Sequence, residues 1–425
     1  KRQNQFRFTS AEETLPAAVE EINAYLSSGL FPGLGAKAAA LVDHFGTKTL
    51  KILDQTPERL TEVRGIGPKT AAKITAGWRE HHAARQLMAF LKENEVPAAH
   101  AARLMKVYGD DSLGILKSDP YRVAAEIPHF GFEIADAIVQ RSELAIPADQ
   151  RAQACLLHLL ERVESQGHCY LPRRQLFQLA QKIFGLGEEL CAQALKSLSA
   201  SHEMVVETDA DVGIRAGDTG EPASRAVFSA FLHHCETKIG QHLAAVAQLP
   251  QVGAPPDNDA LNALVARDLA VALAEDQLRV LEGVLGQRMA IITGGPGTGK
   301  TTLIRSLATV FKAQGRIIAL AAPTGRAARR MSAVTGRKAT TIHRLLEYSV
   351  AEGRLRHDLS DPLDLDVLIL DEASMLDLPL CYHLLAAMPL SARLILVGDV
   401  YQLPSVGTGT VLADLIASKA VPTFQ

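Results

Sequence analysis

The sequence predicts a multidomain protein, with an α-helical N-terminal region followed by an α/β domain that carries a phosphate-binding loop. Two patterns predict this architecture. Helical segments broken by glycine and proline fill residues 1–145, whereas apolar strand-like runs alternate with helical ones in residues 261–425. Continuous apolar runs are typical of parallel strands that are covered on both faces. With 425 residues, 47% of them hydrophobic, the chain is long enough for about two to four domains.

The N-terminal region, residues 1–145, contains an internal repeat. Segment 44–74 matches segment 107–138 after a one-residue insertion. The matched pairs are Gly46 with Gly109, Leu50 with Leu113, Ile52 and Leu53 with Ile115 and Leu116, Pro57 with Pro120, Gly67 with Gly131, Ala71 with Ala135, and Ile74 with Ile138. One unit of short helices, separated by glycine and proline, has therefore been duplicated.

Residues 146–222 predict a winged-helix-like module, because three helical patterns precede a segment, 203–216, that alternates like a hairpin. Contact with DNA and a purely structural spacer are equally open roles for this module. Residues 223–260 follow as a helical linker, which ends in a stretch rich in proline, glycine and aspartate. The helical pattern of the linker begins at residue 225.

The segment 292–302, ITGGPGTGKTT, fits the phosphate-loop pattern, with an apolar strand before it and a helix after it. Glycines let several backbone N–H groups converge on one anion, and the N-terminus of the helix adds partial positive charge. We expect Lys300 to meet the β- and γ-phosphates of ATP and the Thr301 hydroxyl to ligate Mg²⁺. The predicted nucleotide contacts in the loop are Gly295, Pro296, Gly297, Thr298, Gly299, Lys300, Thr301 and Thr302.

Two further groups follow apolar strands of the same domain. The run VLIL ends at Asp371 and Glu372, and the run RLILV is followed by Gln402 a few residues later. The carboxyl ends of parallel strands share one edge of the sheet, where ligands bind. We expect Asp371 to hold Mg²⁺, Glu372 to take a proton from the attacking water, and Gln402 to bond that water and the γ-phosphate.

In their order along the chain, these motifs resemble the RecD-like helicases of superfamily 1, group B. The resemblance rests on Gln277, GGPGTGKTT, APTGRAARRM at 322–331, TIHRLL at 341–346, LDEASMLD and GDVYQLPSVG. It covers the first RecA-like motor domain. It implies that Gln277 contacts adenine and that single-stranded DNA lies along Pro323, Thr324, Gly325 and Arg326, with His343 close by. It also implies a strand-splitting β-hairpin near residues 347–365.

The N-terminal region resembles the long form of the same family, which carries tandem helix-hairpin-helix units. The turns FPGLGAKAA at 31–39 and VRGIGPKTAAKI at 63–74 present Gly33 with Gly35 and Gly65 with Gly67. Such turns expose backbone N–H groups to a DNA phosphate, and Lys69 and Lys37 add charge, although similar hairpins also occur as packing elements. VPAAHAARL lacks both glycines and PHFGFEIAD keeps only Gly131, so neither is assigned a phosphate contact.

The resemblance implies an ATP- and Mg²⁺-dependent 5′–3′ DNA helicase that acts at single-strand/duplex junctions in repair or recombination. The implied partners are DNA and, through the N-terminal extension, a single-strand-binding or other repair protein; a monomer is expected. The family's N-terminal β-barrel and second RecA-like domain have no match here, so the sequence is expected to be a fragment. Two alternatives remain: a DNA-binding module regulated by ATP, and a conjugative relaxase-helicase.

The composition constrains these readings. The net charge of −3 excludes binding of nucleic acid by bulk charge, so DNA contacts must come from local patches. The five cysteines include no CxxC pair, which disfavours a zinc site and a disulfide framework. No apolar run is long enough to span a membrane, and the first residues lack the apolar core of a signal peptide. A cytoplasmic location is expected.

Overall fold

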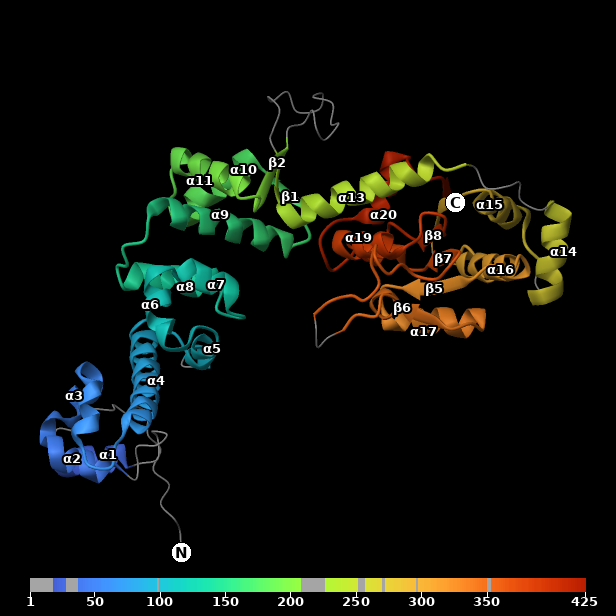
Figure 1. Ribbon diagram of the computed structural model, residues 1–425. Coiled ribbons are helices and arrows are strands. Elements are labelled where there is room, and N and C mark those ends of the chain that lie inside the picture. The colour runs from blue at the N-terminus through green and yellow to red at the C-terminus, as the bar shows by residue number, and fades with distance from the viewer. Residues whose placement is uncertain are drawn as a thin grey trace, which may run out of the picture. The chain divides into compact units, whose positions relative to one another are not determined.

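The computed structural model describes residues 18–27, 37–97, 99–207, 226–250, 257–269, 272–295, 297–349 and 353–425. The chain forms two compact units, residues 1–154 and 155–425, which are described separately below (Figure 1). The first unit is helical in its described part, and the second contains a parallel sheet flanked by helices. The predicted fold class is therefore confirmed. None of the helices in the described segments is both long and apolar enough to cross a bilayer.

Short helices and turns build the first unit around two hydrophobic cores, one for each copy of the repeat. The helices are α1 (Val19–Leu26), α2 (Ala38–Phe45), α3 (Thr49–Gln55), α4 (Pro68–Glu93), α5 (Ala99–Tyr108), α6 (Ser112–Ser118), α7 (Pro120–Glu126) and α8 (Gly131–Arg141). The 3-10 segments η2 (Gly46–Lys48), η3 (Pro57–Glu62) and η4 (Gly109–Asp111) connect some of them.

The duplication is visible in the backbone. Gly46 and Gly109 both have a φ of 57°, and each follows the last residue of a helix. The hydroxyl of Thr49 donates to the Gly46 carbonyl at 2.7 Å, and Ser112 donates to the Gly109 carbonyl at 2.5 Å. Both hydroxyl residues are fully buried. Equivalent turns thus use equivalent hydrogen bonds in the two copies.

The second unit begins with a small helical and antiparallel module. Its elements are the end of α9 (Ala148–Glu164), β1 (Tyr170–Pro172), α10 (Arg173–Phe184), α11 (Glu188–Ala200), β2 (Met204–Glu207) and β3 (Ala226–Ser229). In the sheet, β3 lies between β1 and β2 and pairs antiparallel with both. The sequence predicted helix for 226–229; this apolar run is a strand because it has two partner strands, and the helix begins only after Ser229, which caps it. The rest of the expected hairpin lies outside the described residues.

The α/β domain is built on parallel strands in the order β6-β5-β7-β8-β4-β9. The strands are β4 (Met289–Thr293), β5 (Ile318–Ala322), β6 (Ala339–Thr341), β7 (Val367–Leu370), β8 (Arg393–Gly398) and β9 (Thr423–Phe424). The helices are α13 (Ala230–Ala247), α14 (Asn258–Leu269), α15 (Glu275–Leu285), α16 (Lys300–Ala313), α17 (Gly325–Thr335), α18 (Ile342–Leu345), α19 (Leu378–Ala387) and α20 (Val411–Ser418). One core includes residues of α13, α19 and α20, and the other includes residues of α14, α15 and α16.

Candidate nucleotide and DNA site

The predicted catalytic groups meet at the carboxyl edge of the parallel sheet. The phosphate loop follows β4, Asp371 follows β7, and Gln402 lies in the loop after β8. Strand register fixes their level, because Thr293 pairs with Gly398 and Leu370 pairs with Leu396. The strands β4, β7 and β8 are therefore neighbours in the sheet, with β8 between the other two, and their carboxyl ends lie side by side.

The phosphate loop leaves the N-terminus of α16 without a side-chain cap. Gly297 and Gly299 have φ values of 82° and 88°, and Gly299 is the N-cap of α16. The Lys300 ammonium donates to the backbone carbonyls of Gly294 and, at 2.7 Å, of Gly295. The loop therefore curves around its own lysine, and phosphate oxygens would replace those carbonyls as acceptors. Pro296 lies outside the described residues.

Gln277 lies against the last glycine of this loop. Its Oε1 accepts the Ala274 N–H at 3.2 Å, which fixes the side chain at the first turn of α15. A Cβ placed on Gly299 would overlap Gln277 Nε2. The residue expected to contact adenine is thus adjacent to the loop expected to hold the phosphates.

Asp371 and Glu372 occupy a strained turn. Asp371 Oδ1 accepts the Glu372 N–H at 2.9 Å, and Glu372 has a φ of 53°, in the left-handed region. A non-glycine residue there costs about 1–3 kcal/mol and is typical of functional sites. Burial raises the pKa of both carboxyl groups, and the charge of Asp371 raises the pKa of Glu372 further. The charges of Lys300 and Arg330 oppose these shifts.

Asp399, which was not among the predicted site residues, holds the loop that carries Gln402. Its side chain is 3% exposed and accepts the Tyr401 N–H at 3.0 Å and the Gln402 side-chain amide at 3.2 Å. The preceding Gly398 packs on the turn after Glu372. A Cβ on Gly398 would lie 2.7 Å from Leu412 Cδ2 and about 3.1 Å from the nearest backbone nitrogen of that turn. The ends of β7 and β8 are therefore in direct contact.

A cavity of about 650 Å³ connects the catalytic groups to the expected DNA path. Glu372 and Gln402 line it on one side, and Thr324, Arg326 and Arg330 of the α17 region line it on the other. Arg330 was not predicted from the sequence. It could have been found from its position four residues after Arg326, because residues four apart lie on the same face of a helix and Arg326 was already expected to contact DNA.

The expected DNA residues follow the adjacent strands β5 and β6. After Pro323, Thr324 caps α17 by accepting the Ala327 N–H at 3.3 Å, so that Gly325 and Arg326 form the first turn of the helix. After β6, Thr341 caps the short helix α18 in the same way, and His343 lies in that helix. Since β5 and β6 pair in parallel, these helix starts lie along one edge of the sheet.

In the first unit, the turn at Gly65 and Gly67 has the features of a phosphate contact. Gly65 has a φ of 90°, and Gly67 is the N-cap of α4, whose first turn contains Lys69 and has no side-chain cap. Lys37 Nζ would lie 3.5 Å from a Cβ on Gly65, so its charge is beside the turn. In the second copy, His129 takes a φ of 63° at the position that matches Gly65. Gly33 and Gly35 lie outside the described residues.

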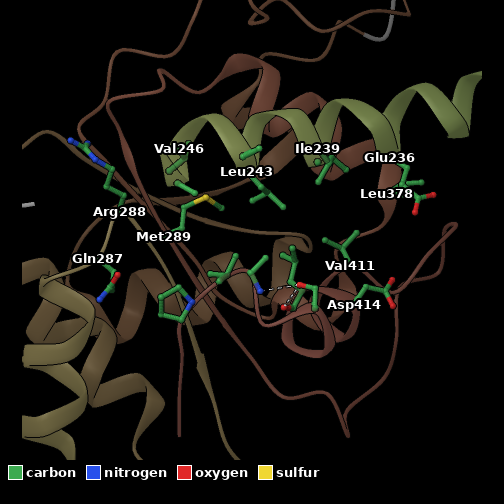
Figure 2. Close-up of a pocket in the computed structure, with 18 of the residues that line it drawn as sticks. Glu236, Ile239, Leu243, Val246, Gln287, Arg288, Met289, Leu378, Val411 and Asp414 are labelled. Carbon is green, nitrogen blue, oxygen red and sulfur yellow. Dashed lines mark hydrogen bonds between the residues drawn. The ribbon is translucent and has the colours of Figure 1, made fainter. Parts of the chain in front are cut away.

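A larger apolar cavity, of about 800 Å³, lies elsewhere in the second unit. Figure 2 shows Ile239, Leu243 and Val246 of α13 on one side of it and Val411 and Asp414 of α20 on another. Residues 286–289, at the amino end of β4, also line it, whereas the phosphate loop follows the carboxyl end of that strand. This cavity is therefore not the nucleotide site.

Three family models match successive parts of the chain. A model described as a SAM-like helix-hairpin-helix tandem matches residues 31–80, one for the HHH domain of the ATP-dependent RecD2 DNA helicase matches 80–170, and one for an AAA domain matches 277–408. Together they cover the helical region and the α/β domain described above.

Two RecD-type proteins are similar to this chain in sequence. The ATP-dependent RecD2 DNA helicase of Deinococcus radiodurans is 31% identical over 418 residues, which are 97% of this chain and 57% of that protein. The RecBCD enzyme subunit RecD of Mycolicibacterium smegmatis is 40% identical over 166 residues, 33% of this chain and 30% of that subunit. The crystal structure of Pif1 helicase from Candida albicans aligns with 32% of this chain and 34% of that chain, with 26% identity and a TM-score of 0.26. The family models and the RecD-type relatives together support a RecD-like helicase of superfamily 1.

Proposed function

We propose that this chain is the nucleotide- and DNA-binding part of an ATP-hydrolysing helicase that moves 5′ to 3′ on single-stranded DNA. It would open single-strand/duplex junctions during repair or recombination. The supporting observation is that Lys300, Glu372 and Gln402 meet at one sheet edge, where Glu372 and Gln402 line a cavity together with Arg326. The chain spans 57% of the Deinococcus relative, so unwinding is a proposal about the whole protein.

The residues present fit ATP and Mg²⁺. The Thr301 hydroxyl and the Asp371 carboxylate would hold the ion, since Mg²⁺ prefers oxygen ligands, and the bound ion would neutralise charge on the phosphates. Gln277 would contact the adenine, and its side chain lies beside Gly299, the last glycine of the loop. The uncapped first turn of α16 and the other loop residues from Gly295 to Thr302 would donate backbone N–H groups to phosphate oxygens. Pro296 has no N–H and would only contact the nucleotide.

The hydrolytic step assigns one task to each remaining group. Lys300 leaves the carbonyls of Gly294 and Gly295 and binds the β- and γ-phosphate oxygens. Glu372 accepts a proton from the attacking water, a role favoured by a pKa that is raised towards neutrality by burial. Gln402 orients that water through its side-chain amide, which Asp399 already holds at 3.2 Å.

DNA would be held by two separate regions. In the second unit, the starts of α17 and α18 would bind the tracked strand through Pro323, Thr324, Gly325, Arg326 and His343. In the first unit, Gly65, Gly67 and Lys69 would bind a backbone phosphate at the uncapped start of α4. Gly33 and Gly35 are proposed for the same role by analogy of sequence only. The first unit could instead recruit a repair protein, which is an outcome of the test below.

Two measurements test the proposal. In the first, ATP hydrolysis is measured with and without single-stranded DNA for the wild type and for Glu372→Gln, a substitution that removes the base and keeps the shape. We expect wild-type ATP turnover to rise when DNA is added. We expect Glu372→Gln to bind ATP but to hydrolyse it about 10²-fold more slowly. Wild-type ATP binding that changes DNA affinity without any hydrolysis would support the regulatory alternative instead.

The second measurement concerns polarity. A protein that moves 5′ to 3′ displaces streptavidin from a biotin at the 3′ end of a single strand faster than from a biotin at the 5′ end. The opposite preference would refute the proposed direction. If the Gly65→Val variant binds DNA as tightly as the wild type, the first unit would be assigned to the recruitment of a protein instead of DNA binding.

A further inference from the structure

Another cavity, of about 1010 Å³, lies between α19 and the segment that follows α18. It adjoins the expected DNA path because His343 of α18 is one of its lining residues. Its aromatic and basic lining groups are His343, Tyr348, Arg354, His357, Tyr382 and His383. Neither the nucleotide groups nor the α17 residues line it, so His343 is the one residue named in the site above that reaches this cavity.

Rings face the cavity from two elements. On the α18 side, the rings of His343 and Tyr348 make an edge contact with centroids 6.0 Å apart. On the α19 side, Tyr382 lies 5.0 Å from the ring of His383 and 5.4 Å from the ring of His234 in α13. These edge and tilted contacts fix the rings without stacking them face to face. Tyr348 is 45% exposed, so part of its ring is available to a ligand.

The wall that carries Tyr348 is tied down by hydrogen bonds. Ser349 and Arg354 form an antiparallel bridge, with the Ser349 N–H donating to the Arg354 carbonyl at 2.9 Å. The Arg356 N–H donates back to the Leu346 carbonyl at 3.1 Å, and the Arg356 guanidinium donates to Glu347 at 2.7 Å. The described part of this segment is thus folded against α18, and the cavity has a built wall.

The charges of the cavity distinguish a base from a phosphate. Asp358 and Asp377 line it, and hydrogen bonds from Ser360 lower the pKa of Asp358, so this carboxylate is ionised at neutral pH. The two carboxylates outnumber the single guanidinium of Arg354 in the lining, so the cavity does not favour a phosphate. The ring systems, in contrast, suit the flat face of a nucleobase, and a carboxylate accepts hydrogen bonds from base amino groups.

We propose that this cavity is a nucleobase pocket, in which Tyr348 and Tyr382 hold one unstacked base of the DNA strand that passes His343. The inference rests on the proposed binding of single-stranded DNA. The helix starts described above would hold DNA phosphates, whereas this cavity would hold a base. It lies next to the segment in which the sequence predicts a strand-splitting hairpin.

The test is a double-mutant cycle between the protein and the DNA. Affinity for a single strand is measured with an abasic site placed at each successive position, for the wild type, Tyr348→Ala and the ring-preserving control Tyr348→Phe. We expect one position at which removal of the base weakens wild-type binding by about tenfold, the loss of one stacked base. At that position Tyr348→Ala should show no further loss, whereas Tyr348→Phe should behave as the wild type. Tyr348 is half-exposed, so its truncation should not unfold the protein.

The outcomes separate this inference from the proposed function. If the wild type binds no single-stranded DNA, the proposed function fails. If it binds DNA and Arg326→Ala weakens binding, but the abasic scan is flat or Tyr348→Ala costs the same at every position, the base pocket alone is refuted. Quenching of 2-aminopurine at the same position, lost in Tyr382→Ala and kept in Tyr382→Phe, would support the pocket by a signal that does not depend on affinity.

Discussion

A single methyl group added at Gly398 should lower both the stability of the second unit and its rate of ATP hydrolysis. It ends β8 and lies against the turn that follows Glu372. In Gly398→Ala the new Cβ would lie 2.7 Å from Leu412 Cδ2, 3.1 Å from Ser374 N and 3.2 Å from Ala373 N. Leu412 can rotate, but two backbone nitrogens cannot move without displacing the turn.

The size of the effect follows from these distances. Overpacking by one methylene group costs about 1–3 kcal/mol, so the thermal midpoint of the second unit should fall by several degrees. The backbone must shift by a few tenths of an ångström. Because a displacement of 1 Å can cost about 10²-fold in rate, we expect ATP turnover to fall by about three- to tenfold.

The matched control is Gly240→Ala, in the middle of α13. A Cβ there meets no atom within 4 Å, and the backbone is helical. Alanine should therefore stabilise the helix by about 0.5–1 kcal/mol and leave turnover unchanged. The measurements are urea unfolding and DNA-stimulated ATP hydrolysis. If Gly398→Ala matched the wild type in both, the contact between β8 and the catalytic turn would be refuted; normal turnover with reduced stability would refute only the link to Glu372.

Four further predictions concern other parts of the chain. Lys300→Ala should lower ATP affinity or turnover by about 10²-fold while DNA binding by the first unit persists; normal turnover would exclude the phosphate-loop assignment. Arg330→Ala should lower DNA-stimulated ATP hydrolysis by about tenfold and change single-strand affinity little, with Arg330→Lys intermediate; equal losses of affinity and turnover would make Arg330 a simple DNA contact. Gly65→Val, at a φ of 90°, should weaken DNA binding without affecting nucleotide affinity, as measured by anisotropy with each ligand, and Gly114→Ala, whose Cβ meets nothing, is its control. Burial raises the pKa of Cys235 from 9.0 to about 11 and that of Cys381 to about 12. As the pH rises above 9, the unfolded state loses these thiol protons before the folded state does, so the free energy of unfolding should fall. Urea unfolding from pH 8 to 10 measures this fall, and Cys381→Ala should make it smaller.

Local patterns were enough for the parts of the site that lie in one continuous segment. The phosphate loop, the two carboxylates after β7 and the match of Gly46 with Gly109 could be read from the sequence, because each is defined by a continuous segment. Asp399 was not, because its role depends on burial and on hydrogen bonds within a loop whose fold the sequence pattern does not specify. The strand 226–229 was missed for a related reason: its partners are residues 170–172 and 204–207.

The arrangement also explains how DNA and nucleotide could influence one another over a short path. α17 presents Arg326 at its first turn and Arg330 one turn later, and both line the cavity that contains Glu372 and Gln402. A rotation of α17 that follows a change in the DNA strand would therefore move a positive charge relative to the catalytic carboxylate. The buried Asp399 and the close packing at Gly398 hold the start of the loop that carries Gln402. Arg330 rather than Gln402 is therefore expected to carry the DNA dependence of turnover, because it lies in the helix that begins at the expected DNA contacts and lines the same cavity as Glu372.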